Sequence, residues 1–192
     1  YSRAASIPVG YEIVAKTEHY LDEKTGRTKR RCPVTKNEMA RNLIRQVIAN
    51  HLLFTYILAD IWFAATDTMN LIKLELKKEF IFALKENRKV ALSQEDKLNG
   101  RYQRIDTLEM PDNSTLLVFL EGLSFPLLLV KQLFTNEDGS SGLRYLVSSD
   151  LSLDFDQATT IFQKRWKVEL YHRSLKQNAA LAKSPTRTVT TQ

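Results

Sequence analysis

Two short apolar runs with an amphipathic helical pattern between them constrain the fold of this chain most strongly. Residues 52–59 are nearly all apolar and bulky, as expected of a β-strand buried on both faces of a sheet. Residues 80–85 (FIFALK) form a second short apolar strand, and residues 67–78 between them place apolar side chains at helical spacing. Strand, helix and strand in this order predict a parallel βαβ unit, and hence an α/β fold.

Asp60 directly follows the first of these strands and is the lone charge in the run that surrounds it. Ligands bind at the carboxyl ends of the strands in open α/β sheets, so Asp60 is a candidate functional carboxylate. The alternative is an ordinary aspartate that ends a strand and begins a turn. Trp62 and Phe63 continue the apolar run beyond Asp60, which favours the functional interpretation.

Residues 161–177 (IFQKRWKVELYHRSLKQ) predict a helix with one carboxylate among cations on a single face. Phe162, Arg165, Glu169 and Lys176 are spaced by three, four and seven residues, and Arg173 falls beside them. At roughly 100° per residue these side chains share one stripe. A carboxylate among cations stays ionised and can hold a divalent metal, while the cations can hold phosphate. The alternative is a surface helix with ion pairs between successive turns.

The spacing Phe162-x2-Arg165-x3-Glu169-x6-Lys176 resembles the Tyr-x2-Arg-x3-Glu-x6-Lys signature of a large group of transposases from bacterial insertion sequences. In that group the Glu is the last carboxylate of an Asp-Asp-Glu triad, and the other three residues contact DNA. Phe162 replaces the Tyr, which keeps the ring and loses the hydroxyl. The apolar strand that ends at Asp60 is similar to the strand that carries the second Asp of these enzymes.

The resemblance implies roles for particular residues. Asp60 and Glu169 would be catalytic and would bind Mg²⁺ or Mn²⁺, because these hard cations prefer carboxylate oxygens. Phosphates would be held by Arg165, Arg173 and Lys176. The aromatic residues that would stack on or wedge against bases are Phe162, Trp62 and Trp166. For the two tryptophans, packing in the core is an equally good alternative.

Between the Asp60 strand and the Glu169 helix, the pattern changes to short strands and turns. The transposase group named above is known for a β-rich insertion at this place. We therefore expect an α/β (α+β) fold, an RNase H-like mixed sheet flanked by helices, with a β-rich insertion before the last catalytic helix. That helix should begin at Asp154 or Asp156 and end near Ala182. The expected parts are 1–87 (partial core), 88–150 (insertion), 151–182 (catalytic helix) and 183–192 (flexible tail).

The beginning of the chain gives weaker signals. Residues 7–20 are rich in β-branched and aromatic side chains and predict one or two strands. A basic cluster follows, formed by Arg27, Lys29, Arg30 and Arg31, and such clusters are more often solvated loops than DNA-binding elements. Residues 37–51 predict an amphipathic helix capped by Asn37.

The composition suits a nucleic-acid partner. Lys and Arg number 28 against 22 acidic residues, which gives a formal charge of +6 and a pI near 9.4. The single cysteine, Cys32, argues against a disulfide framework or a cysteine zinc site and fits the reducing bacterial cytoplasm, with the protein at the nucleoid. The most apolar run, residues 116–134, is interrupted by charged residues and a proline, so we expect two sheet strands there and no membrane association.

One carboxylate of the triad has no counterpart in the sequence. The first catalytic Asp of RNase H-like transposases lies on their first, central strand, whereas no Asp precedes Asp22 here and Asp22 lies in a polar loop. Because the sequence also starts at Tyr1, we expect a truncated fragment that lacks the first strand and is inactive alone. The full enzyme would hydrolyse phosphodiesters and transfer strands in cut-and-paste transposition, acting on double-stranded DNA, with a homodimer as one possible assembly. The alternatives are a non-catalytic DNA-binding remnant and another RNase H-like nuclease.

Overall fold

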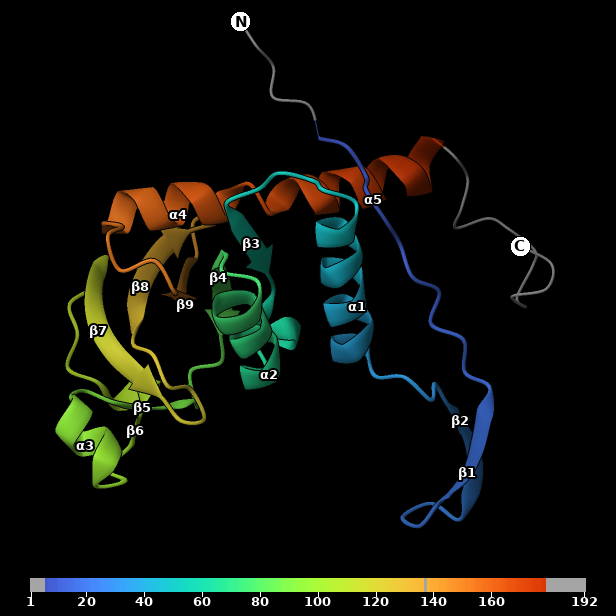
Figure 1. Cartoon of the computed structure of the whole chain (residues 1–192), viewed down its shortest axis with the longest axis horizontal. Helices are drawn as coiled ribbons and strands as arrows, with labels where there is room; N and C mark the ends of the chain where they lie inside the picture. The colour runs from blue at the N-terminus through green and yellow to red at the C-terminus, as the bar shows by residue number, and fades with distance from the viewer. Residues whose placement is uncertain (1–5, 137, 179–192) are drawn as a thin grey trace, which may run out of the picture. The chain divides into compact units, whose positions relative to one another are not determined.

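The computed structural model describes residues 6–136 and 138–178 (Figure 1). The chain divides into two compact units. One unit is formed by Leu53–Arg165, and the other by Tyr1–Leu52 together with Trp166–Gln192. In the part of the chain that is described, no helix has the length and apolar character needed to cross a membrane.

The Leu53–Arg165 unit is built on a seven-stranded mixed sheet in the order β3-β4-β9-β8-β7-β5-β6. β3 and β4 are parallel, and every other neighbouring pair is antiparallel. The predicted βαβ unit and the predicted fold class, a mixed sheet flanked by helices, are both confirmed. The strands are β3 (Tyr56–Ala59), β4 (Glu79–Leu84), β5 (Lys89–Ala91), β6 (Gln103–Arg104), β7 (Ser114–Leu120), β8 (Leu127–Thr135) and β9 (Ser141–Ser148).

The β3 strand is shorter and less buried than its apolar sequence predicts. Only Tyr56–Ala59 form the strand, all four residues are half-buried, and Leu53 before it is 97% exposed. The prediction of a strand over residues 52–59 buried on both faces is therefore wrong. The reason is position, because β3 stands at one end of the sheet and β4 is its only ladder partner within the described ranges. The strand buried on both faces is instead β4, in which Phe80, Ile81 and Phe82 are fully buried.

The crossover from β3 to β4 is helical, as predicted, but irregular. It consists of the 3₁₀ turn η1 (Ile61–Phe63), α2 (Thr66–Asn70) and the π-helical turn η2 (Leu71–Glu75). Two short elements follow β5 and β6, namely α3 (Gln94–Leu98) and the 3₁₀ turn η3 (Ile105–Thr107).

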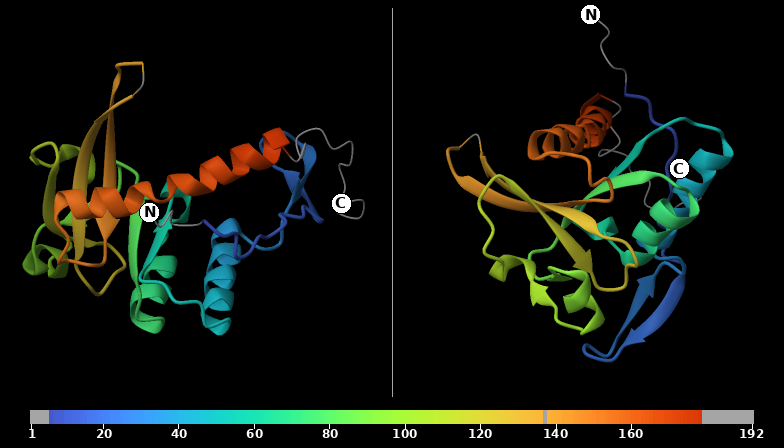
Figure 2. Two further views of the ribbon diagram at one scale, coloured as in Figure 1. Left: turned by 90° about the horizontal axis from the view of Figure 1, so that it is seen from above. Right: turned by 60° about the vertical axis from the view of Figure 1, so that its left-hand side comes forward.

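Helix α4 (Phe155–Gln163) packs across one face of the sheet (Figure 2). Its first turn is closed by a capping box, in which the Asp154 carboxylate accepts a hydrogen bond from the Gln157 amide and the Gln157 side chain accepts one from the Asp154 amide. The sequence predicted Asp154 or Asp156 as the cap of this helix, and the cap is Asp154. The core on this face contains Ile81, Ala83, Leu128, Val130, Leu146, Ala158 and Phe162.

A buried serine joins the segment after β9 to the start of β4. The Ser149 hydroxyl accepts a hydrogen bond from the Phe80 amide (3.0 Å) and donates one to the Glu79 carboxylate (2.6 Å). The Lys73 ammonium lies 2.7 and 2.8 Å from the two Glu79 oxygens. These contacts give hydrogen-bond partners to the polar groups at the amino end of β4, and they hold the start of that strand in place.

A second link lies at the amino end of β3. The Tyr56 hydroxyl donates a hydrogen bond to the Asp150 carboxylate (2.5 Å). Burial, and then the contact with Asp150, raise the pKa of Tyr56 to about 12. Burial alone would raise the pKa of Asp150, but hydrogen bonds from the Ser152 and Tyr56 hydroxyls outweigh it and leave that pKa below its usual value.

The second unit holds a small sheet and two helices. β1 (Glu18–Asp22) and β2 (Arg27–Arg31) form a separate antiparallel hairpin, so the basic cluster lies on a strand and not in a loop. Of the strand predicted for residues 7–20, only the last three residues are in β1, and the described residues before them form no regular element. Helix α1 (Lys36–Ala49) is capped by Thr35 rather than Asn37, because the Thr35 hydroxyl accepts a hydrogen bond from the Glu38 amide.

The predicted long catalytic helix is two helices. α4 ends at Gln163, and α5 (Trp166–Asn178) begins after a turn at residues 164–165. A physical reason is that α4 has the buried residues Ala158, Thr159 and Phe162, whereas no described residue of α5 is buried. Tertiary packing supplies most of the stability of a helix, so the two segments differ in what supports them. The predicted end at Ala182 and the tail 183–192 lie outside the described residues. The predicted domain boundaries stay a prediction.

Candidate active site

Asp60 lies at the carboxyl end of β3, where the sequence places it. It is the N-cap of η1, and its Oδ1 atom accepts a hydrogen bond from the Ile61 amide at 2.7 Å. The carboxylate is half-buried. An N-cap contact of this kind fixes the side chain at the strand end, so one carboxylate oxygen is oriented by the backbone.

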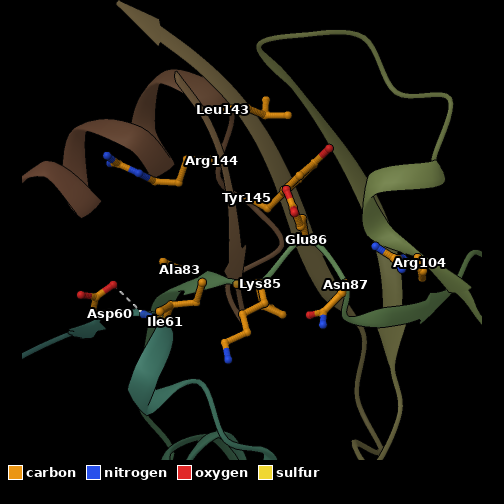
Figure 3. A pocket seen from close by; sticks show the side chains of 11 residues that line it. Asp60, Ile61, Ala83, Lys85, Glu86, Asn87, Arg104, Leu143, Arg144 and Tyr145 are labelled. Atoms are coloured by element: carbon orange, nitrogen blue, oxygen red, sulfur yellow. Dashed lines mark hydrogen bonds between the residues drawn. The ribbon is translucent and has the colours of Figure 1, made fainter. Parts of the chain in front are cut away.

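A cavity of about 570 Å³ opens at this end of the parallel strand pair (Figure 3). It collects residues from the ends of β3 and β4 and from the beginning of β9, together with Arg104. The cavity is lined by both polar and apolar side chains and carries both signs of charge. Its lining residues are Asp60, Ile61, Ala83, Leu84, Lys85, Glu86, Asn87, Arg104, Leu143, Arg144 and Tyr145.

The three cations of the cavity differ in their surroundings. The Arg104 guanidinium donates two hydrogen bonds to the Asp106 carboxylate, so a carboxylate already offsets its charge. This pair raises the pKa of Arg104 and lowers the pKa of Asp106. The Arg144 guanidinium lies over two aromatic rings, 4.7 Å from the centroid of Phe134 and 5.7 Å from that of Phe162. These contacts hold Arg144 between the β8–β9 hairpin and α4.

Lys85 and Trp62 form a pair beside Asp60. The Lys85 ammonium lies 5.4 Å from the centroid of the Trp62 ring, and Trp62 is 73% exposed. The alternative that Trp62 packs in the core is therefore wrong. An exposed indole can stack on the face of a base, and the neighbouring ammonium group can attract the phosphate of that nucleotide.

Phe162 is placed differently from the prediction that it contacts DNA. Its ring is 3% exposed and belongs to the core between α4 and the sheet. A ring in this position cannot stack on a base without leaving the core, so Phe162 is a core residue in this structure. The guanidinium groups of Arg144 and Arg165 lie within 5.7 and 5.6 Å of its centroid. Phe162 therefore positions two arginines.

The remaining residues of the predicted stripe lie on α5. Glu169 is half-buried, while Arg173 and Lys176 are exposed and follow it at spacings that keep all three on one helical face. Trp166 is 50% exposed. Asp60 belongs to the Leu53–Arg165 unit and Glu169 to the other unit, so the convergence of these two carboxylates stays a prediction.

The donor type of Asp60 suits a divalent cation, because its carboxylate oxygens are the hard ligands that Mg²⁺ and Mn²⁺ prefer. Glu86 and the Asn87 amide contribute further oxygens to the same cavity. Across residues 6–136 and 138–178, however, no group of three or more His, Cys, Asp or Glu side chains could hold a metal ion. Asp60 therefore fits as one ligand of a metal ion.

Some residues of the cavity were missed by sequence reasoning. The buried strand β4, parallel to β3, is directly followed by Lys85, Glu86 and Asn87. Ligands bind at the carboxyl ends of such strands, and this rule, which made Asp60 a candidate, applies to these three residues as well. Arg144 is different, because it enters the cavity from β9, and the antiparallel pairing of β4 with β9 cannot be read from sequence spacing.

Comparison with known protein families gives a match for the chain. A sequence profile described as the transposase DDE domain matches residues 31–191, which is most of the chain. The mixed α/β sheet of the structure is consistent with the RNase H-like fold of that family, and its members are enzymes that act on DNA with a divalent metal. No curated protein matches the chain in a sequence search. The matched profile covers well over half of the sequence, and the chain therefore belongs to the family of transposases with a DDE domain.

Proposed function

We propose that the chain is part of the catalytic domain of a cut-and-paste DNA transposase from a bacterial insertion sequence. The full enzyme would act on double-stranded DNA at the ends of the element. The observation that carries the proposal is the cavity at the carboxyl end of β3 and β4, which brings the Asp60 carboxylate together with cations. A phosphodiester is an anion, and its cleavage by enzymes of this family depends on a carboxylate-held metal beside it.

In this proposal Asp60 and Glu169 hold Mg²⁺ or Mn²⁺. The cation, when bound, lowers the pKa of a water molecule and offsets the negative charge that develops on the phosphate. The Asp60 side chain is oriented for this role by its hydrogen bond to the Ile61 amide. Glu169 is the carboxylate on α5 that corresponds to the last member of the triad, and its approach to Asp60 is part of the proposal.

The cations of the chain hold the DNA backbone. Arg173 and Lys176 are exposed on the face of α5 that carries Glu169. Arg165, whose guanidinium lies over the Phe162 ring, is the third proposed phosphate ligand. Exposed Trp62, with Lys85 above its ring, offers a surface for a base, and Trp166 is the second proposed stacking residue.

The 192 residues supply two of the three carboxylates that the reaction needs, so we propose that this chain alone binds DNA without cutting it. Metal-dependent catalysis in this family would draw its ligands from all three carboxylates of the triad, and Asp60 and Glu169 would supply two of them. The alternative function, a DNA-binding remnant, shares the binding but not the metal site.

An assay on end-labelled duplex DNA tests the proposal. The chain should retard the duplex and leave both strands intact in Mg²⁺ or Mn²⁺. Metal-dependent cleavage that disappears in Glu169→Gln would show that a complete active site is present, against the two-carboxylate proposal. Failure to bind any duplex at low salt would contradict DNA as the substrate.

A further inference from the structure

A basic β-hairpin lies almost wholly outside the residues that match the family. The match begins at residue 31, whereas the hairpin runs from Glu18 to Arg31. All five residues of β2 (RTKRR) are exposed, and β1 and β2 form a two-stranded sheet of their own. Neither the catalytic-domain match nor the core of the large sheet accounts for this element.

The hairpin is held in one register by its turn. The Asp22 carboxylate accepts hydrogen bonds from the backbone amides of Lys24 (3.1 Å) and Thr25 (3.0 Å), and it pairs with the Lys29 ammonium. That ammonium is the main reason why the pKa of Asp22 lies below its usual range. Gly26 closes the turn at φ +62°, a left-handed conformation that favours glycine. Register decides which side chains share a face.

The two faces of the hairpin differ in charge. Successive side chains of a strand point to opposite faces. On one face, which we term the paired face, two cations are bound to carboxylates and one of them also covers a tyrosine ring. The paired face consists of Glu18, Arg31, Tyr20, Lys29, Asp22 and Arg27, with the contacts Arg31–Glu18 (3.0 Å), Lys29–Asp22 and Arg31–Tyr20 (5.6 Å to the ring centroid).

The opposite face carries no carboxylate, and we term it the acid-free face. It consists of His19 opposite Arg30 and Leu21 opposite Thr28. Leu21 is 65% exposed, and within the described parts of the chain Arg30 has no carboxylate partner. One exposed face of the ribbon therefore carries a guanidinium, an imidazole, a hydroxyl and an apolar side chain. The polar groups can bind phosphate oxygens and base edges, and the apolar side chain can contact a thymine methyl group.

We propose that the acid-free face of the β1–β2 hairpin docks in the major groove of duplex DNA, with Arg30 contacting a backbone phosphate. The major groove of B-form DNA admits a two-stranded β-ribbon. The paired face would point to solvent, where ion pairs already offset two of its three cations, Lys29 and Arg31. The inference rests on the proposed function only in taking DNA as the partner, and it adds a contact surface outside the catalytic domain.

Substitution of neighbouring arginines provides a matched test. Arg30→Ala and Arg31→Ala each remove one positive charge from the same strand, but from opposite faces of the hairpin. For duplex DNA at about 0.1 M salt, Arg30→Ala should weaken binding roughly fivefold to tenfold and reduce the slope of log affinity against log salt by about one. Arg31→Ala should change the affinity less than about twofold. Arg30→Lys, which keeps the charge, should recover most of the parent affinity.

Four outcomes would overturn the inference. Equal losses for Arg30→Ala and Arg31→Ala would mean that net charge alone matters. An unchanged affinity in Arg30→Ala would remove the hairpin from the interface, and a parallel loss in Lys176→Ala would then leave DNA as the substrate of the domain. Equal or tighter binding to an RNA duplex, whose major groove is too narrow for a ribbon, would contradict the groove assignment. Absence of any duplex binding would overturn this inference and the proposed function together.

Discussion

Replacing Phe162 tests the claim that this signature residue is a core residue. Its ring is 3% exposed and packs with six other buried residues between α4 and the sheet. Removing the ring loses about 2–3 kcal/mol of apolar burial, and the unfilled cavity brings the cost of Phe-to-Ala substitution to about 3–5 kcal/mol. Two guanidinium groups over the ring, those of Arg144 and Arg165, would lose their contacts as well.

Urea unfolding followed by far-ultraviolet circular dichroism measures this effect. With an m-value of about 2 kcal/mol per M, the midpoint should fall by roughly 2 M in Phe162→Ala. Phe162→Leu keeps most of the apolar volume and should cost about 1–1.5 kcal/mol, which isolates the contribution of the ring. Trp166→Ala, at a half-exposed position, serves as the control and should cost about 1 kcal/mol or less. Similar midpoints for Phe162→Ala and Trp166→Ala would refute the core assignment.

Three further predictions concern other parts of the chain. Ser149→Ala leaves a buried backbone amide without its acceptor and should cost about 1–3 kcal/mol in urea unfolding, whereas Ser152→Ala at an exposed site should cost less than 1 kcal/mol. The pKa of Tyr56 is raised to about 12, so the stability that this group contributes is complete below pH 10 and is lost as the pH rises towards 12. Tyr56→Phe should flatten that alkaline loss, and a difference titration at 295 nm should lack one late tyrosine; an unchanged titration would contradict the raised pKa. Lys176→Ala should weaken binding to all duplex sequences about equally and reduce the salt slope by about one, and an identical slope would remove α5 from the DNA interface.

The sequence predicted those features of the fold that depend on local pattern. The apolar strand β4, the parallel pair β3–β4 and the placement of Asp60 at its carboxyl edge follow from residue spacing and the rules of βαβ units. The Asp154 cap follows from the chemistry of helix starts. In each case the cause lies within a few residues of the effect, so a sequence window contains the information.

Features set by tertiary context were not predictable in this way. Residues 52–55 are as apolar as a buried strand, yet Leu53 is exposed, because burial depends on whether a neighbouring strand covers that edge. Phe162 sits in a signature that suggests DNA contact, but the helix turns it into the core. The cavity needs Arg144 from β9, and only the pairing of distant strands brings that residue to the end of β4.

The most direct test of the central claim is whether Asp60 and Glu169 share one metal ion. Fe²⁺ can replace Mg²⁺ in carboxylate sites, and with peroxide and ascorbate it cuts the polypeptide close to where it is bound. A shared site predicts two cuts in the parent chain, one near residue 60 and one near residue 169, both suppressed by excess Mg²⁺. It further predicts that Asp60→Asn and Glu169→Gln each abolish both cuts, because each substitution removes a ligand of the same ion. If Asp60→Asn removed only the cut near residue 60 and Glu169→Gln removed only the other, the two carboxylates would belong to separate sites, and the proposed active site would be wrong.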